Sequence, residues 1–231
     1  MSLGCSARGA HAINDLSAMK LSSFFSRAAL AAVGLSLLGS AASAASPWTV
    51  RARATYLDMA DRSDAFGALG LNFASDAVSV NSKWIPEVDV SYAFTEHLSA
   101  ELVLTIPQSQ EVKLAGVGSL GKFKHLPPTL LAQYNFAPRA TVQPYVGAGV
   151  NFTLIFDKDL RVATVPLDLE DYSVGLAAQA GVNIKLGANS HLNLDVKRAA
   201  LESDVFVKGG PRLTTAKLDP WLYSVGFGWQ F

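Results

Sequence analysis

The segment at 97–101 carries a histidine, a serine and a glutamate at every second position. Alternate residues of an extended strand project to the same face, so His97, Ser99 and Glu101 would share one side of the chain. A base, a hydroxyl nucleophile and a carboxylate in contact are the parts of an ester hydrolase. Whether they can act together depends on the elements that carry them.

Other reactive residues give weaker signals. His125 has no Ser or Asp placed beside it by spacing, which favours a hydrogen-bonded lining role over catalysis. The stretch GVGSLGK at 116–122 loosely resembles a phosphate-binding loop, but it does not join a strand to a helix. No spacing of His, Asp or Glu predicts a metal site. We therefore expect no metal and no cofactor.

Charge and cysteine content exclude further classes of protein. The 19 Lys and Arg residues balance the 19 Asp and Glu residues, which argues against a nucleic-acid partner. The only cysteine is Cys5, which lies in the N-terminal targeting segment described in the next paragraph. Neither disulfides nor a thiol site is therefore expected in the chain that remains after cleavage. Half of the residues are hydrophobic. After residue 45 they are dispersed and form no run long enough for a membrane helix.

The first 44 residues have the features of a targeting segment. Lys20 and Arg27 precede an apolar stretch at 28–38, and Ala42-Ser43-Ala44 matches a cleavage site. We interpret 1–44 as an over-extended N-terminus plus a signal peptide, with Met19 as the true start. The mature chain would then be 45–231.

The mature chain consists of alternating segments. Apolar residues occupy every second position in eight stretches, which is typical of β-strands with two different faces. These are Trp48–Leu57, Trp84–Phe94, Leu98–Ile106, Phe123–Phe136, Val142–Phe156, Tyr172–Leu186, Leu192–Ala199 and Pro220–Phe231. Short connections at 95–97, 137–141 and 187–191 alternate with long ones at 58–83, 107–122, 157–171 and 200–219. The pattern predicts an all-β fold, an eight-stranded antiparallel transmembrane β-barrel with its short turns in the periplasm.

The aromatic residues indicate which solvent surrounds this barrel. A soluble lipocalin-like barrel would show the same alternation with the apolar face turned inward. Here the aromatics gather at the two ends of the apolar face: Trp48, Phe94, Phe136, Trp229 and Phe231 at one end, and Tyr56, Trp84, Phe152, Phe156, Trp221 and Tyr223 at the other. Two such belts match the two interfaces of a bilayer. We expect outer-membrane lipid around the barrel, and the terminal Phe231 to be a signal for the barrel assembly machinery.

Several stretches resemble the outer-membrane protein W family. They are WTVRARATYLD at 48–58, KHLPPTLLAQYNF at 124–136, PYVGAGVNFT at 144–153, GLAAQAGVN at 175–183, LNLDVK at 192–197 and DPWLYSVGFGWQF at 219–231. The resemblance implies an eight-stranded barrel in the outer membrane of a Gram-negative bacterium. It also implies a narrow channel for small hydrophobic molecules and, for some members, a receptor role for colicins or phage.

The inward-facing residues of the predicted barrel form two sets, one near the outer mouth and one deeper in the lumen. An apolar vestibule for small hydrophobic molecules is expected near the outer mouth, from Leu57, Ile85, Val103, Phe123, Ile155 and Leu222. The alternative is that these residues merely pack the upper lumen. A charged floor is expected below, from Arg51, Arg53, Glu87, Asp89, Glu101, Asp195 and Lys197. Charges in so narrow a lumen must pair or be hydrated, so the floor would stabilise the barrel or, alternatively, form an ion path.

Two further features concern entry and exit. Phe66, Leu69, Leu71 and Phe73 in the first long connection would cap the vestibule or pack against neighbouring loops. Prolines that cannot donate a ladder hydrogen bond lie within strand segments, at Pro86, Pro127, Pro128, Pro144 and Pro220. Because the first three lie towards the outer half, we predict a side exit into the bilayer near the second to fourth strands, unless bulges absorb the prolines.

The resulting prediction is a narrow channel or binding vestibule for small hydrophobic molecules, with lateral release into the membrane. One alternative is a surface receptor or structural protein that acts through its loops. Another is a lipid-modifying barrel enzyme. The topology opposes the enzyme, because it places His97 at a periplasmic turn and lipid-modifying barrels of this kind work near the outer leaflet. We therefore expect no catalytic residue.

Overall fold

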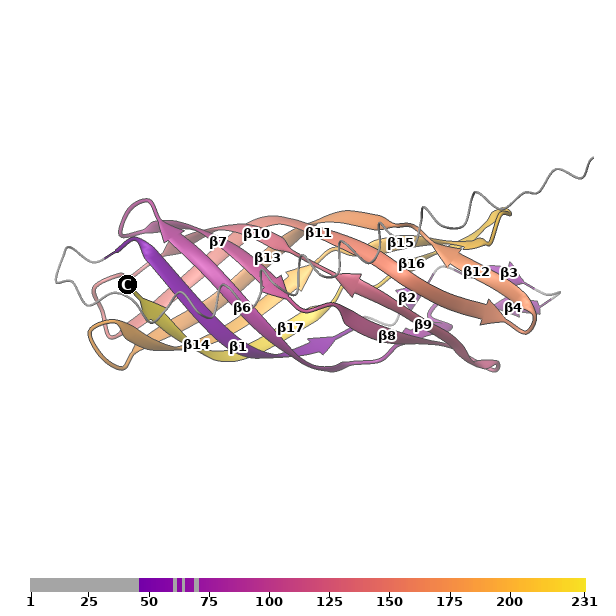
Figure 1. Ribbon diagram of the computed structural model, residues 1–231, viewed down its shortest axis with the longest axis horizontal. Helices are drawn as coiled ribbons and strands as arrows, with labels where there is room; N and C mark the ends of the chain where they lie inside the picture. The colour runs from indigo at the N-terminus through magenta and orange to yellow at the C-terminus, as the bar shows by residue number, and fades with distance from the viewer. Residues whose placement is uncertain (1–45, 60–61, 64, 69–70) are drawn as a thin grey trace, which may run out of the picture. The chain divides into compact units, whose positions relative to one another are not determined.

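The computed structural model describes residues 46–59, 62–63, 65–68 and 71–231 (Figure 1). The predicted signal peptide and start lie outside these residues. The described chain is all β. None of its segments is a helix long and apolar enough to span a membrane.

Eight long strands close into a ring. In chain order they are β1 (Trp48–Asp58), β6 (Lys83–Ala93), β7 (Leu98–Thr105), β10 (Thr129–Asn135), β11 (Val142–Val162), β13 (Tyr172–Lys185), β14 (Ser190–Ala199) and β17 (Trp221–Gln230). Each pairs antiparallel with its neighbours, and β1 pairs with β17 from Thr49↔Gln230 to Asp58↔Trp221. The predicted eight-stranded barrel is confirmed.

The four long connections were predicted as loops, and this was wrong for much of their length. They form β2 (Arg62–Ser63), β3 (Phe66–Ala68), β4 (Leu71–Phe73), β5 (Val78–Val80), β8 (Gln108–Leu114), β9 (Gly118–Leu126), β12 (Val165–Leu169), β15 (Glu202–Val207) and β16 (Arg212–Lys217). All except the β3–β4 hairpin belong to the same sheet as the barrel. We call β2, β5, β8, β9, β12, β15, β16 and the end of β11 beyond Leu154 the upper sheet. Figure 1 shows it towards the right.

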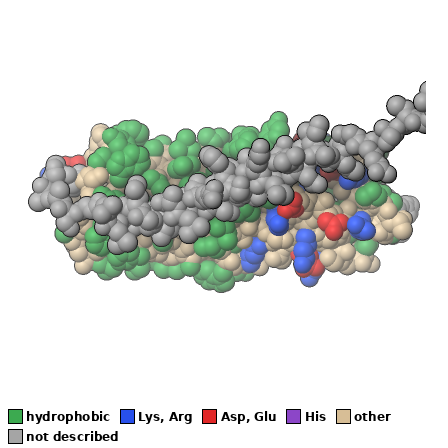
Figure 2. Space-filling model, viewed as in Figure 1, with side chains coloured by type: hydrophobic (Ala, Val, Ile, Leu, Met, Phe, Trp, Pro, Cys, Tyr) green, Lys and Arg blue, Asp and Glu red, His purple; other side chains and the backbone are tan. Residues whose placement is uncertain are grey.

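The outer surface of the ring is apolar. Outward side chains such as Leu130, Val174 and Leu176 are more than half exposed, although they are large and apolar. Aromatic side chains at both ends of this surface contact one another, as Trp48 does with Tyr92 and Tyr56 with Trp84. Hydrophobic side chains cover much of this part of the molecule in Figure 2, and charged ones gather on the upper sheet. The surface therefore has the composition that a bilayer requires.

One seam of the wall is interrupted. Pairing between β7 and β10 ends at Val103↔Thr129, and pairing between β8 and β9 starts at Gln108↔His125. No ladder pair joins 104–107 to 126–128, all of which the structure describes. Pro107, Pro127 and Pro128 lie within these two stretches and cannot donate to a ladder. We call this interruption the seam gap.

The other prolines behave differently from one another. Pro144 sits inside β11 opposite Val182, so the sheet absorbs it. Pro220 lies just before β17. Pro86 pairs with Ala54 on β1, but it lies one residue beyond the last β6–β7 pair, Glu87↔Thr105. The interruption therefore lies beside the second to fourth barrel strands, where the sequence predicted a weak seam.

Candidate functional site

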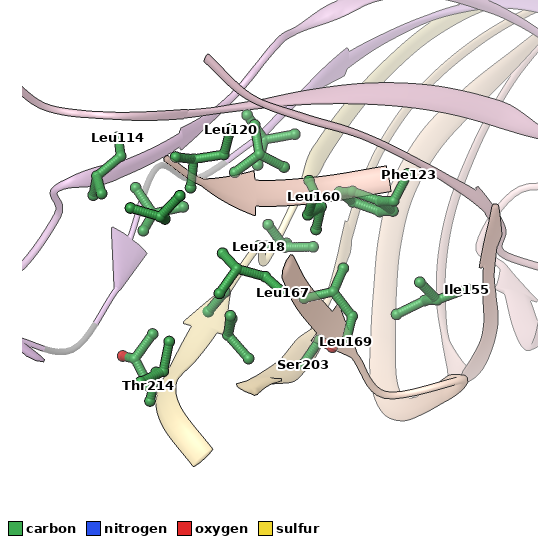
Figure 3. Close-up of a pocket in the computed structure, with 17 residues that line it drawn as sticks. Leu114, Leu120, Phe123, Ile155, Leu160, Leu167, Leu169, Ser203, Thr214 and Leu218 are labelled. Carbon is green, nitrogen blue, oxygen red and sulfur yellow. The ribbon is translucent and has the colours of Figure 1, made fainter. Parts of the chain in front are cut away.

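An apolar cavity lies inside the upper sheet (Figure 3). Strands β5, β8, β9, β11, β12, β15 and β16 contribute its walls. The lining is aliphatic and aromatic, with Ser203 and Thr214 as the polar exceptions. A pocket with such walls favours apolar molecules, because little polar surface loses water when the ligand binds.

The predicted vestibule residues are only partly brought together at this cavity. Phe123 and Ile155 line it, and both are 2–3% exposed. Leu57 and Ile85 belong to the same cluster of buried apolar residues as Phe123 and Ile155, which we call the cavity cluster, and Leu222 packs against it. Val103 does not belong to it. It lies in a separate buried cluster with Leu131, Ala177 and Ala199.

The predicted cap is also only partly described. Phe73 packs against the cavity cluster. For Phe66 and Leu71 the structure describes the backbone, which pairs Phe66↔Phe73 and Ala68↔Leu71 in the β3–β4 hairpin. Leu69 lies outside the described residues. Whether these residues close the cavity stays a prediction.

Most of the cavity wall comes from residues that the sequence reading had assigned to loops. They include Val112, Leu114, Leu120, Leu160, Leu167, Leu169 and Leu218. A signal was available, since Val112 and Leu114 alternate with Glu111 and Lys113, and Leu167 and Leu169 alternate with Pro166 and Asp168. These runs are short and flanked by turns, so they resemble ordinary polar loops unless the register of the whole sheet is known.

Below the cavity the lumen holds uncharged polar residues. Thr55 and Ser224 hydrogen-bond to each other at 2.9 Å. Asn151 donates to the hydroxyl of Thr129 at 2.7 Å and accepts from that of Thr153 at 2.6 Å. All five are buried. This layer separates the apolar cavity from the charged floor. The sequence did not predict it.

All seven predicted floor residues are buried, and they form one ion-pair network. Arg53 lies 3.0 Å from Glu87 and 2.8 Å from Asp89. Lys197 lies 2.7 Å from Glu87 and 2.9 Å from Asp195. Arg51 lies 2.7 Å from Glu101. Cations and carboxylates are interleaved, so each charge has a partner of opposite sign nearby.

Neighbouring polar residues complete the floor. Tyr145 donates its hydroxyl to Asp195 at 2.6 Å, and Gln133 donates to Glu101 at 2.7 Å. The side chain of Tyr145 can extend past β13 to Asp195 because Gly181 on β13 has no side chain in its way. A Cβ on Gly181 would lie 2.4 Å from the tyrosine oxygen. The lumen is thus filled by large polar side chains opposite glycines. Such a floor opposes the passage of apolar molecules, since they would have to displace paired charges.

His125 lies between the cavity and the seam gap. It pairs with Ile155 on β11, in the upper sheet. The next pair, Phe156↔Lys124, carries an exposed lysine that binds Asp157, so Phe156, which was predicted as a belt residue, and His125 both lie above the membrane-spanning part of the barrel. Its Nε2 lies 3.2 Å from Nε2 of Gln110. Burial, together with the positive charge of Lys83, lowers the pKa of His125 to about 4. The imidazole is therefore neutral at ordinary pH.

The hydrolase set is not assembled. The ring of His97 contacts the backbone oxygen of Asn135 at 2.7 Å, and Ser99 donates to Gln133 at 3.2 Å. Glu101 is held by Arg51 and Gln133. Gln133 therefore lies between Ser99 and Glu101, and the ring of His97 is engaged elsewhere, so the three residues do not bond to one another as a hydrolase set would. Within the described part of the chain, no group of three His, Cys, Asp or Glu side chains could hold a metal ion.

Comparison with known proteins gives consistent matches. The model of the OmpW family matches residues 45–231. The outer-membrane protein y4mB of Sinorhizobium fredii is 36% identical over 194 residues, which is 80% of each chain. The dibenzothiophene metabolism operon protein PahQ of Pseudomonas aeruginosa is 28% identical over 191 residues, covering 80% of this chain and 89% of PahQ. The crystal structure of OprG from Pseudomonas aeruginosa superposes with a TM-score of 0.69 at 27% identity, covering 81% and 97% of the two chains.

Proposed function

Because the chain belongs to the OmpW family and lies in the outer membrane of a Gram-negative bacterium, we propose that it is a conduit for small hydrophobic molecules. A molecule from outside enters the apolar cavity of the upper sheet. It leaves sideways through the seam gap into the outer leaflet and does not cross the lumen.

The observation that carries this proposal is the position of the seam gap. It lies above the ion-paired floor and directly below the cavity, between Val103↔Thr129 and Gln108↔His125. The floor opposes a vertical path for apolar molecules, whereas the wall just below the cavity lacks its ladder hydrogen bonds. Outward residues along the gap, Leu104 and Ile106, are apolar and exposed, at 40% and 53%. An apolar molecule that leaves there meets lipid.

The similarity to PahQ supports the choice of ligand class. That relative is named for a dibenzothiophene metabolism operon, and dibenzothiophene is a small aromatic molecule. The cavity here has an aromatic wall residue, Phe123, among aliphatic ones. Small aromatic compounds are therefore the first probes to test.

The test is uptake of the apolar dye 1-N-phenylnaphthylamine by Gram-negative cells, since the dye fluoresces once it reaches hydrocarbon. Cells that produce the barrel should take it up faster than cells that do not. Phe123→Arg, which puts a charge in the cavity, should remove that gain. The matched control is Lys122→Arg on the same strand, which faces outward and is exposed.

Restoring backbone donors tests the exit separately. Pro127→Ala with Pro128→Ala restores one amide that faces the seam, that of residue 127, and one that faces Phe152 on β11, because the carbonyl of Pro128 already accepts from Phe152. The double substitution should slow uptake while leaving dye binding to the purified barrel intact. If Phe123→Arg and the proline pair both leave uptake unchanged, the conduit is wrong. The protein would then act as a receptor or structural protein through its surface loops, and exchanging loops between relatives would be the next experiment.

A further inference from the structure

Gln110 and His125 form an incomplete polar pair beside the apolar cavity. They are 0% and 2% exposed, and their Nε2 atoms lie 3.2 Å apart. Oε1 of Gln110 and Nδ1 of His125 have no hydrogen-bond partner among the described residues. A buried polar atom without a partner costs about 1–3 kcal/mol, so two in one pair require an explanation.

The pair lies between the cavity and the seam gap. Along β9 the order is Phe123 at the cavity, His125, and then the gap at 126–128. Along β8 the order is Val112 at the cavity, Gln110, and then the gap at 104–107. Gln110 is directly opposite Phe123 in the ladder, and the rings of Phe123 and His125 are 6.0 Å apart. A molecule that moves from cavity to gap therefore passes this pair.

The unused atoms always comprise one donor and one acceptor. If the Gln110 amide donates to His125 Nε2, the proton is on Nδ1, which is then a free donor, and Oε1 is a free acceptor. If the amide is turned over and Nε2–H of His125 donates to its oxygen, the free donor is the Gln110 amino group and the free acceptor is Nδ1. The neutral imidazole allows both arrangements.

We propose that this pair recognises a hydroxyl group on an otherwise apolar molecule. A hydroxyl is a small neutral group that both donates and accepts, so it offers a partner of the right kind to each unused atom whichever way the amide is turned. Apolar walls on the cavity side hold the rest of the molecule. This inference rests on the proposed function and narrows its substrates to small hydrophobic alcohols and phenols.

The experiment compares three probes of similar size on the purified, refolded barrel in one detergent: naphthalene, 1-naphthol and 1-methoxynaphthalene. Binding is measured at equilibrium and corrected for partition into empty micelles. We expect 1-naphthol to bind about tenfold or more tightly than naphthalene, because it makes two hydrogen bonds to otherwise unsatisfied groups. The methoxy compound accepts but cannot donate, and its affinity should be intermediate.

The variant Gln110→Leu with His125→Phe replaces both polar groups by apolar ones and should remove the preference for 1-naphthol while keeping naphthalene binding. The matched control is Thr55→Val with Ser224→Ala, an equally buried pair whose mutual hydrogen bond is already made; it should keep the preference. Folding is checked by the heat-dependent shift of the barrel on gels. If the variant does not fold, the three-probe series on the unmodified protein still decides.

The outcomes separate the two proposals. Absence of saturable naphthalene binding to the unmodified barrel contradicts the conduit itself. Saturable binding with equal affinity for all three probes leaves the conduit standing and overturns hydroxyl recognition. A preference for 1-naphthol that survives in the Gln110→Leu/His125→Phe variant also overturns it, because another group must then bind the hydroxyl.

Discussion

The two halves of this barrel belong to one sheet but have opposite interiors. In the membrane half the inside is charged and the outside apolar, as Glu87 and Val90 illustrate on β6. In the upper sheet the inside is apolar and the outside charged, as Leu160 and Arg161 illustrate on β11. The surrounding solvent, lipid or water, therefore decides which face of a strand is apolar.

Strand β11 runs through both halves and shows how the change is made. Its inward residues have odd numbers up to Ile155 and even numbers from Leu160. The shift coincides with an irregularity in the β9–β11 register between Phe156 and Asp159. Asp157 there has φ of 49°, a left-handed conformation. The bulge thus lets a new alternation begin where the strand leaves the membrane.

The largest expected effect is in the charged interior. Glu87 accepts hydrogen bonds from both Arg53 and Lys197. Glu87→Gln should lower the free energy of unfolding by about 3–5 kcal/mol, because it removes the carboxylate that two buried cations share and leaves each with one carboxylate partner fewer. Urea unfolding in lipid measures this. The control Glu96→Gln removes an exposed pair with Arg139 and should change little, so similar losses would contradict a tightly coupled floor.

The apolar interior should be sensitive to lost volume. Leu160 is 4% exposed in the cavity wall. Leu160→Ala should cost about 2–5 kcal/mol if the upper sheet is a packed core. Naphthalene binding to the same sample should change as well, since the substitution reshapes the cavity. A stability loss below about 1 kcal/mol would mean that the upper sheet is loosely packed.

The outer surfaces give a matched pair. Val90 faces the bilayer, so Val90→Arg should destabilise the lipid-refolded barrel by about 2–4 kcal/mol. Val117→Arg changes the same residue type at the exposed β8–β9 turn and should stay within about 0.5 kcal/mol. The neighbouring Asp89→Ser should avoid the lipid penalty, although it disturbs the floor. Equal tolerance at Val90 and Val117 would reverse the assigned facing.

The last prediction concerns pH. Burial and Lys83 lower the pKa of His125 to about 4 in the folded protein, while the unfolded value is about 6.5. The unfolded state therefore binds the proton first, so stability is full above pH 6.5 and is lost as the pH falls towards 4. The slope is at most about 1.4 kcal/mol per pH unit. His125→Gln should reduce it, and an unchanged pH profile would show that the ring is already solvated.

Much of the membrane half could be predicted from the sequence. Period-two alternation over long segments determines which residues face lipid, and the charged floor follows from the opposite parity. The upper sheet could not be predicted, because strands such as β12 are five residues long and their facing changes at bulges. The pairing of Gln110 with His125 depends on a register across β8 and β9 that includes a shift between Val112 and Lys113. Local sequence does not determine such a register.

Closure of the ring by β1 and β17 has a consequence for assembly. The two strands lie at opposite ends of the described barrel, so the last seam forms between segments about as far apart as the chain allows. Contacts this distant in sequence form slowly. Until they form, β1 and β17 each present unpaired N–H and C=O groups, which hydrocarbon does not tolerate. A nascent barrel that lacks its final strand is therefore unfit for the bilayer, and completeness of the chain becomes a physical condition for stable insertion.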